Sequence, residues 1–234
     1  MKIDFETFKT DLSLTKADIC RELYLQHGDM IRIQKEHVAV KNLVRIIDST
    51  LRLAGSKGFH AMSLRDLCAD SGFSIGGLYA YIRNKDDLLV LIQGHGFLLT
   101  RRVLLKSIEG IVDPFDKLRA AVSSHLFLSE LMLPWFYFSF MEVKSLPKKQ
   151  MRAAIAVEQE IEDIFFNIIS VGIETGQFLP INARLLSSTI KALMQDWYLK
   201  RRKYRNQSIS VSQYVDFVIA MLAGVLTDPA RTHK

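Results

Sequence analysis

The sequence predicts an all-α fold in two helical parts, and three observations favour it. The 234 residues include only 5 prolines and 12 glycines, with long stretches free of both. No run of alternating apolar and polar residues bounded by turns indicates a β-strand. Apolar residues instead recur at helical spacing, and with 49% hydrophobic residues the chain is long enough for one large core or two modest ones.

Charge, cysteine content and hydropathy narrow the class of protein but do not identify it. A net charge of +6 and a pI of about 9.3 suit nucleic-acid binding but also any moderately basic protein. Cys20 and Cys68 lie far apart, without ligand-like spacing, which indicates no metal site and fits a reducing cytoplasm. We find no signal peptide and no uninterrupted apolar run of membrane-spanning length, the nearest being residues 131–143 with Pro134 inside it. We expect a cytoplasmic protein without cofactor, metal ion or membrane partner.

Residues 1–36 are predicted to form a helical extension. Thr15 and Asp18 match a capping box, and apolar residues follow at helical spacing. Six basic residues against seven acidic ones argue against a basic arm for the DNA minor groove. An appendage packed on the body or on a partner subunit is favoured over a disordered tail.

Residues 38–56 are predicted to form an amphipathic helix whose apolar positions include Leu43, Ile46 and Ile47. Lys41 and Arg45 lie elsewhere on this helix. Such charges are usually only solvated, but beside a DNA-binding motif they become candidate phosphate contacts.

Residues 62–89, MSLRDLCADSGFSIGGLYAYIRNKDDLL, contain three helix starts and one tight turn. Ser63 opens the first helix with a capping box, and this helix ends where Gly72 can adopt a left-handed conformation. Ser74 can cap a second helix, predicted to run to Ile82. Two helices joined by a glycine turn form a helix-turn-helix motif.

Gly76 and Gly77 occupy the first turn of this second helix, where each costs about 1 kcal/mol relative to alanine. A broken local preference of this kind indicates a functional surface. Without β-carbons, the leading end of a helix can approach the phosphates or base edges of a major groove closely. Asn84 then starts a helix predicted to reach Ser107, and Lys85 lies where the helix dipole and its own charge can jointly hold a phosphate.

These residues resemble the DNA-binding region of the TetR family of one-component bacterial transcriptional regulators. The family pattern S/T-x-R-D-L/I … G-x-S-x-G-x-L-Y-x-Y/H-F-x-x-K-x-x-L is matched by Ser63, Arg65, Asp66, Leu67, Gly72, Ser74, Gly76, Leu78, Tyr79, Tyr81, Lys85 and Leu88. Ile82 replaces the usual Phe, and Ile75 stands where many members place a polar or basic base-reading residue. Ile75 either contacts a thymine methyl group or packs with Leu78 and Ile82. The motif and the resemblance together indicate these DNA-binding residues: Lys41, Arg45, Ser63, Arg65, Ser74, Ile75, Gly76, Gly77, Tyr79, Tyr81 and Lys85.

The rest of the chain is predicted to be a helical body. Residues 84–107 form one long helix that leaves the DNA-binding part, with a possible bend at Gly94 and Gly96, and such a helix can couple the two parts. Asp113 and Pro114 mark a strong helix start. The later helices are predicted at residues 115–133, 134–144, 148–172, 182–203 and 210–226.

An aromatic patch around residues 135–141 either fills the core or lines a cavity for an apolar ligand with a few polar anchors. The candidate ligand-binding residues are His125, Trp135, Tyr137, Phe138, Met141, Glu142 and Trp197. The body weakly resembles family members that sense fatty-acyl compounds, on Glu142, Leu146, Pro147, Gly172, Gly176, Phe178 and residues 196–201. The basic residues between 200 and 205 either complement a helix C-terminus or contact the phosphates of an acyl-coenzyme A.

The resemblance implies three parts: an extension (1–36), a helix-turn-helix domain (37–90), and an effector-binding and dimerisation domain (91–234). It also implies a homodimer through the last two helices, although a monomer that buries their apolar stripes internally is an alternative. The expected function is that of a ligand-responsive regulator, a repressor that a hydrophobic effector such as a fatty acid or acyl-coenzyme A releases from a palindromic DNA operator.

Two other classes of function fit the sequence less well. Residues 72–76 match the G-x-S-x-G element of hydrolases, but that element needs a buried strand before the serine, and the preceding residues are polar and helical. No nucleotide-binding or zinc-protease motif is present, so we expect no enzyme activity. A helical interaction scaffold without DNA binding would explain the body, but it would not explain the paired glycines ahead of Tyr79.

Overall fold

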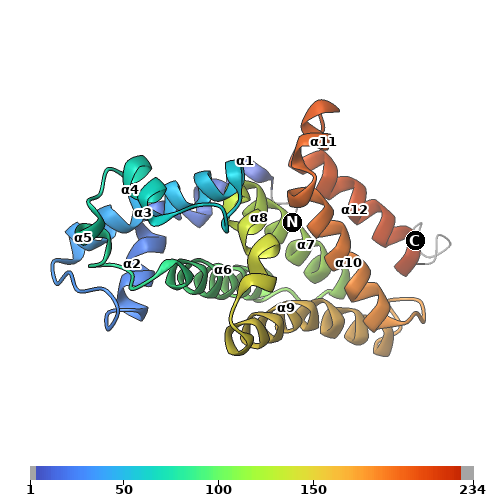
Figure 1. Ribbon diagram of the computed structural model, residues 1–234. Coiled ribbons are helices and arrows are strands. Elements are labelled where there is room, and N and C mark those ends of the chain that lie inside the picture. Colours follow the sequence, from blue (N-terminus) through green and yellow to red (C-terminus); the bar gives the residue numbers. More distant parts are fainter. Residues whose placement is uncertain (1–3, 228–234) are drawn as a thin grey trace. The chain divides into compact units, whose positions relative to one another are not determined.

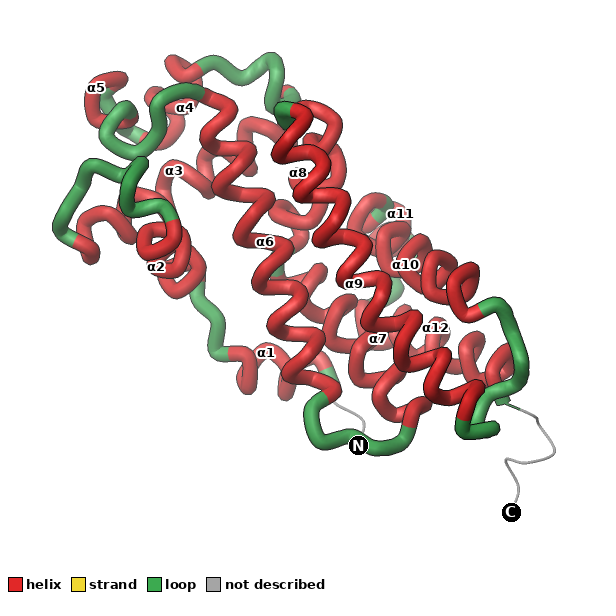
Figure 2. Tube along the Cα trace, turned by 90° about the horizontal axis from the view of Figure 1, so that it is seen from below, coloured by secondary structure: helices red, strands yellow, loops and turns green. Residues whose placement is uncertain are grey.

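A computed structural model describes residues 4–227 of the chain as helices and connecting loops (Figures 1 and 2). It contains no strand within that range, which confirms the all-α prediction. The outermost ends of the predicted segments 1–36 and 91–234, at residues 1–3 and 228–234, lie outside it. The elements are α1 (Phe5–Leu12), α2 (Lys16–Gln26), α3 (Glu36–Lys57), α4 (Leu64–Ser71), α5 (Ile75–Leu78), α6 (Lys85–Ile108), α7 (Pro114–Leu131), α8 (Leu133–Glu142), the 3₁₀ turn η1 (Val143–Ser145), α9 (Lys148–Glu174), α10 (Ala183–Leu199), α11 (Arg201–Asn206) and α12 (Val211–Leu226).

The chain forms two compact units. The head unit comprises residues 13–98 and 134–155, and the body unit comprises residues 1–12, 99–133 and 156–234. Helices α6 and α9 each begin in the head unit and end in the body unit. The helix-turn-helix lies within the head unit. Each unit combines segments from separate parts of the chain. The units therefore do not test the predicted division into three consecutive functional parts, which stays a prediction.

The extension before α3 is helical. The Thr15 capping box forms as predicted and starts α2. This helix packs on α3 in the head unit, where the side chains of Ile19 and Leu23 are buried. Helix α1 belongs to the body unit instead, where the ring of Phe8 lies 5.6 Å from that of Phe127 on α7.

Helix α6 is more apolar than the sequence pattern suggested. Helix α6 is long and apolar enough to cross a membrane, but buried core helices of soluble proteins often have the same length and composition. More than half of its apolar stretch is buried inside the structure. In the head unit, Gly96 allows the indole of Trp135 to approach α6, and Trp135 Nε1 donates a hydrogen bond of 2.6 Å to the carbonyl oxygen of Ile92.

The predicted helix at residues 182–203 is in fact two helices, α10 and α11, separated at Lys200. The rings of Trp197 and Tyr204 stack 5.2 Å apart across this break. In a straight helix these positions, seven residues apart, would be separated by about 10 Å along the axis. The break therefore lets Tyr204 fold back onto Trp197 and donate to the carboxylate of Asp196.

Candidate nucleic-acid interface

The helix-turn-helix is built by the caps that the sequence predicts. Ser63 Oγ accepts a hydrogen bond of 3.1 Å from the Asp66 N–H, and Asp66 Oδ2 accepts one of 2.8 Å from the Ser63 N–H. Helix α4 ends at Gly72, whose φ of 72° lies in the left-handed region. Ser74 Oγ then accepts from the Gly77 N–H at 3.1 Å and caps α5. Lys57 and the Ser63 cap hold the pKa of Asp66 well below its ordinary value.

Helix α5 is shorter than predicted. It covers Ile75–Leu78, whereas the sequence predicted a helix from Ser74 to Ile82. The chain then tightens, because the Tyr81 N–H donates to the Leu78 carbonyl at 2.9 Å, a spacing of three residues instead of four. The tighter turn brings both Tyr81 and Ile82 into the core.

One face of α5 is presented to solvent. Ile75 is 46% exposed and Tyr79 45%, while Leu78 and Ile82 are fully buried. Ile75 is therefore accessible to a partner, and its contact with a thymine methyl group stays a prediction. A β-carbon added at Gly76 would meet no atom within 4 Å, so no neighbour inside the protein requires glycine there.

Two predicted DNA-binding residues are engaged inside the head unit. Tyr81 is buried, and its hydroxyl accepts a hydrogen bond of 2.7 Å from Asn42 Nδ2, so its position does not support direct DNA contact. Arg45 is exposed, but its guanidinium donates to the Ser71 carbonyl at 2.6 Å and lies 4.8 Å from the Phe73 ring centroid. Arg45 thus braces the turn between α4 and α5. Asn42 and Phe73 were not predicted from the sequence, because these contacts join positions far apart in the chain.

Lys85 is engaged as well. Its ammonium group donates to the carbonyl oxygens of Phe59, His60 and Met62, each at 3.0 Å. Direct phosphate binding by Lys85 stays a prediction, and the geometry supports a positioning role. Lys41 and Arg65 are both exposed, and within residues 4–227 neither has an intramolecular ion pair. In the same range no group of three or more His, Cys, Asp or Glu residues could hold a metal ion.

The seven predicted ligand-binding residues are divided between the two units, and their role in ligand binding stays a prediction. His125 and Trp197 are buried in the body unit, where Trp197 Nε1 donates to Glu130 at 3.1 Å. The other five lie on α8 in the head unit. There Trp135 and Phe138 are buried, Tyr137 and Met141 are exposed, and Glu142 accepts a hydrogen bond from Ser145.

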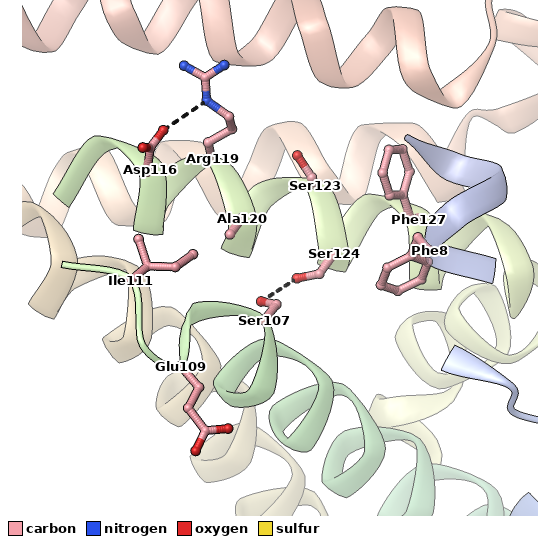
Figure 3. Close-up of a pocket in the computed structure, with 10 residues that line it drawn as sticks. All are labelled: Phe8, Ser107, Glu109, Ile111, Asp116, Arg119, Ala120, Ser123, Ser124 and Phe127. Atoms are coloured by element: carbon pink, nitrogen blue, oxygen red, sulfur yellow. Dashed lines mark hydrogen bonds and ion pairs between the residues drawn. The ribbon is translucent and has the colours of Figure 1, made fainter. Parts of the chain in front are cut away.

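Cavities in the body unit are lined by other residues. One of about 270 Å³ lies along α7, between the aromatic pair Phe8 and Phe127 and the end of α6, with Arg119 and Asp116 at its margin (Figure 3). A second, of about 240 Å³, is bounded by α6, α7 and α9. Its lining is mostly apolar, with Lys117 and Asn167 as polar groups.

The fold and the α4–α5 motif define the class: a helix-turn-helix DNA-binding protein with a helical second domain. Residues 46–92 match the family model for bacterial regulatory proteins of the tetR family, and residues 112–222 match that for the tetracyclin repressor-like C-terminal domain. The chain belongs to the TetR family of transcriptional regulators.

The chain shares a quarter or less of its sequence with three characterised relatives. The chain is 25% identical to the transcriptional repressor KstR of Mycobacterium tuberculosis over 77% of its own length and 80% of that protein. It superposes on AibR in complex with isovaleryl coenzyme A and operator DNA with a TM-score of 0.67, at 20% identity, covering 77% of this chain and 97% of AibR. The regulator FadR from Bacillus subtilis in complex with stearoyl-CoA gives a TM-score of 0.62, at 18% identity and the same coverage.

Proposed function

We propose that this protein is a cytoplasmic homodimeric repressor that binds a palindromic operator through α5 and leaves it when a hydrophobic effector binds the body unit. The observation that carries the DNA-binding proposal is the exposed face of α5. Ile75, Gly76 and Tyr79 form a small, partly apolar surface on a helix whose turn is fixed by caps and by Arg45. Such a surface suits thymine methyl groups and close backbone approach in a major groove.

A second copy of the chain would cover exposed apolar residues on α10 and α12. Leu185 is 66% exposed, Phe217 67% and Val225 40%. Large apolar side chains exposed to this degree on neighbouring helices indicate a protein interface. A two-fold dimer would present two copies of α5 to two half-sites about one DNA turn, roughly 34 Å, apart.

The effector proposal rests on the apolar cavity bounded by α6, α7 and α9 and on the coenzyme A thioesters bound by AibR and FadR. The basic residues between 200 and 205 divide into two groups. Arg201 is paired with Glu130, and Lys200 and Lys203 lie against Asp196. The exposed Arg202 and Arg205 are therefore the better candidates for the phosphates of a coenzyme A.

The test is fluorescence anisotropy with the DNA flanking the gene and with a random duplex of equal length. We expect specific, salt-sensitive binding to the flanking DNA that stearoyl-CoA or a free long-chain fatty acid weakens. Equal affinity for both duplexes, with or without acyl compounds, would favour the scaffold alternative. Specific binding that no acyl compound changes would leave the DNA-binding proposal standing and overturn the effector class.

A further inference from the structure

The loop between α2 and α3, residues 27–35, is attached to the end of the DNA-reading motif. The backbone N–H of Arg32 donates a hydrogen bond of 2.8 Å to the carbonyl oxygen of Ala80, two residues after α5. Ile31 beside it is 4% exposed and anchors the loop in the head unit. Figure 1 shows this loop at the same end of the head unit as α5. The loop precedes residues 46–92, so the family's DNA-binding model does not include it.

Two further contacts fix the loop and the start of α3. The hydroxyl of Tyr24 on α2 donates to the Gln34 carbonyl at 3.1 Å. Asn42, in the second turn of α3, donates to Tyr81 in the turn that follows α5. The segment is therefore held from both sides in a defined place next to Ala80 and the exposed Tyr79.

The charges of this segment are locally unbalanced. The sequence count of six basic against seven acidic residues suggested neutrality, but the structure pairs Arg21 with both Asp18 and Glu36. Arg32 and Lys35 are exposed, and neither has an ion-pair partner among residues 4–227. The acid that remains beside them in the loop is the exposed Asp29. The loop thus presents two cations against one carboxylate.

We propose that Arg32 and Lys35 bind backbone phosphates at the flank of the groove that α5 enters, which makes this loop a second DNA contact of the protein. The inference rests on the proposed DNA binding by α5. A major groove is about 12 Å wide and is bordered by phosphates, so a cation fixed beside the end of a helix in that groove lies at its border. Phosphate contacts carry no sequence information, so they should act on any duplex.

The test compares an Arg32→Ala, Lys35→Ala double variant with wild type on a random 30-base-pair duplex and on the operator, from low to moderate salt. Substitution by alanine keeps the Arg32 backbone N–H and its bond to Ala80. We expect the dissociation constant to rise roughly tenfold or more on both duplexes, and the slope of log K against log salt to fall by about one for each phosphate that the variant no longer binds. The matched control, Lys149→Ala with Arg152→Ala, removes two exposed charges from the same unit and should change neither quantity.

The outcomes separate the two proposals. An unchanged slope and affinity in the double variant, while wild type binds DNA, would overturn the loop contact and leave the function of α5 intact. A smaller slope on random DNA, in a protein that shows no operator preference, would support the loop contact and count against the regulator proposal. Absence of binding to either duplex by wild type would overturn both. Unchanged thermal melting of the variant excludes misfolding as the cause.

Discussion

The ammonium group of Lys85 lies 4.9 Å from the ring centroid of Phe59 and donates a hydrogen bond of 3.0 Å to the Phe59 carbonyl oxygen. Lys85 begins α6, and Phe59 lies in the loop between α3 and α4. The same ammonium group also binds the carbonyls of His60 and Met62, so one lysine closes that loop onto α6. A residue that the sequence motif assigns to phosphate binding therefore has an internal role.

Lys85→Ala should destabilise the protein by about 2 kcal/mol, because it removes a charged donor from three backbone acceptors. The free energy of unfolding in urea measures the effect. Lys149→Ala, which removes an exposed lysine from the same unit, should change stability by less than about 0.5 kcal/mol. A Lys85→Ala variant as stable as wild type but deficient in DNA binding would show that its main role is to contact phosphate.

Gly96→Ala should destabilise the head unit. The new β-carbon would lie 2.6 Å from Trp135 Nε1, so the indole must move and give up its hydrogen bond to Ile92. Overpacking of this kind costs about 1–3 kcal/mol. Gly94→Ala is the control in the same helix: Gly94 is exposed and a β-carbon there would meet nothing within 4 Å. Gly94→Ala should stabilise the protein by up to about 1 kcal/mol. Equal urea midpoints for Gly94→Ala and Gly96→Ala would contradict the role of Gly96 in packing.

The helix starts could be predicted from the sequence because caps are local: Ser63, Ser74, Asp113 and Ser210 each bond a backbone N–H three residues on. What escaped prediction depends on side-chain contacts that reach beyond a single helical turn. At the break at Lys200, the ring of Tyr204 stacks on that of Trp197. After the short helix α5, the hydroxyl of Tyr81 is held by a hydrogen bond from Asn42. The residues of the candidate site could be named from the sequence motif. Only the packing shows that Ile75 and Tyr79 are exposed, whereas Arg45, Tyr81 and Lys85 form hydrogen bonds within the protein.

His125 should make stability depend on pH. Burial, with a smaller contribution from the charge of Lys191, lowers the pKa of His125 well below its ordinary value. Between the unfolded pKa near 6.5 and the lower folded pKa, only the unfolded chain binds this proton. Stability from this group is thus present above about pH 6.5 and is lost as the pH falls, by at most about 1.4 kcal/mol per pH unit.

Urea midpoints at pH 7, 6 and 5 measure this loss. In His125→Gln the pH dependence should be weaker than in wild type, whereas substitution of the exposed His37 by Gln should leave the wild-type profile. Parallel profiles for His125→Gln and wild type would contradict the assignment.

Phe217→Glu should convert the proposed dimer into a monomer, because it places a charge on a side chain that is 67% exposed in one chain and would be buried between two. Sedimentation velocity at micromolar concentration measures the mass. Leu25→Glu provides a control, since Leu25 is also 67% exposed but lies on α2. A dimer that tolerates Phe217→Glu as well as Leu25→Glu would place the interface elsewhere.

The central claim is that the exposed face of α5 enters DNA, and the dissociation constant of Gly76→Ala for the operator tests it most directly. Because nothing lies within 4 Å of the added methyl group, the variant should fold at least as stably as wild type. We expect its affinity for the operator to fall about tenfold, since the methyl group holds the helix away from the groove. Gly55→Ala, at an equally open and exposed position on α3, should bind as wild type. Equal operator affinity of wild type, Gly76→Ala and Tyr79→Ala would contradict the claim.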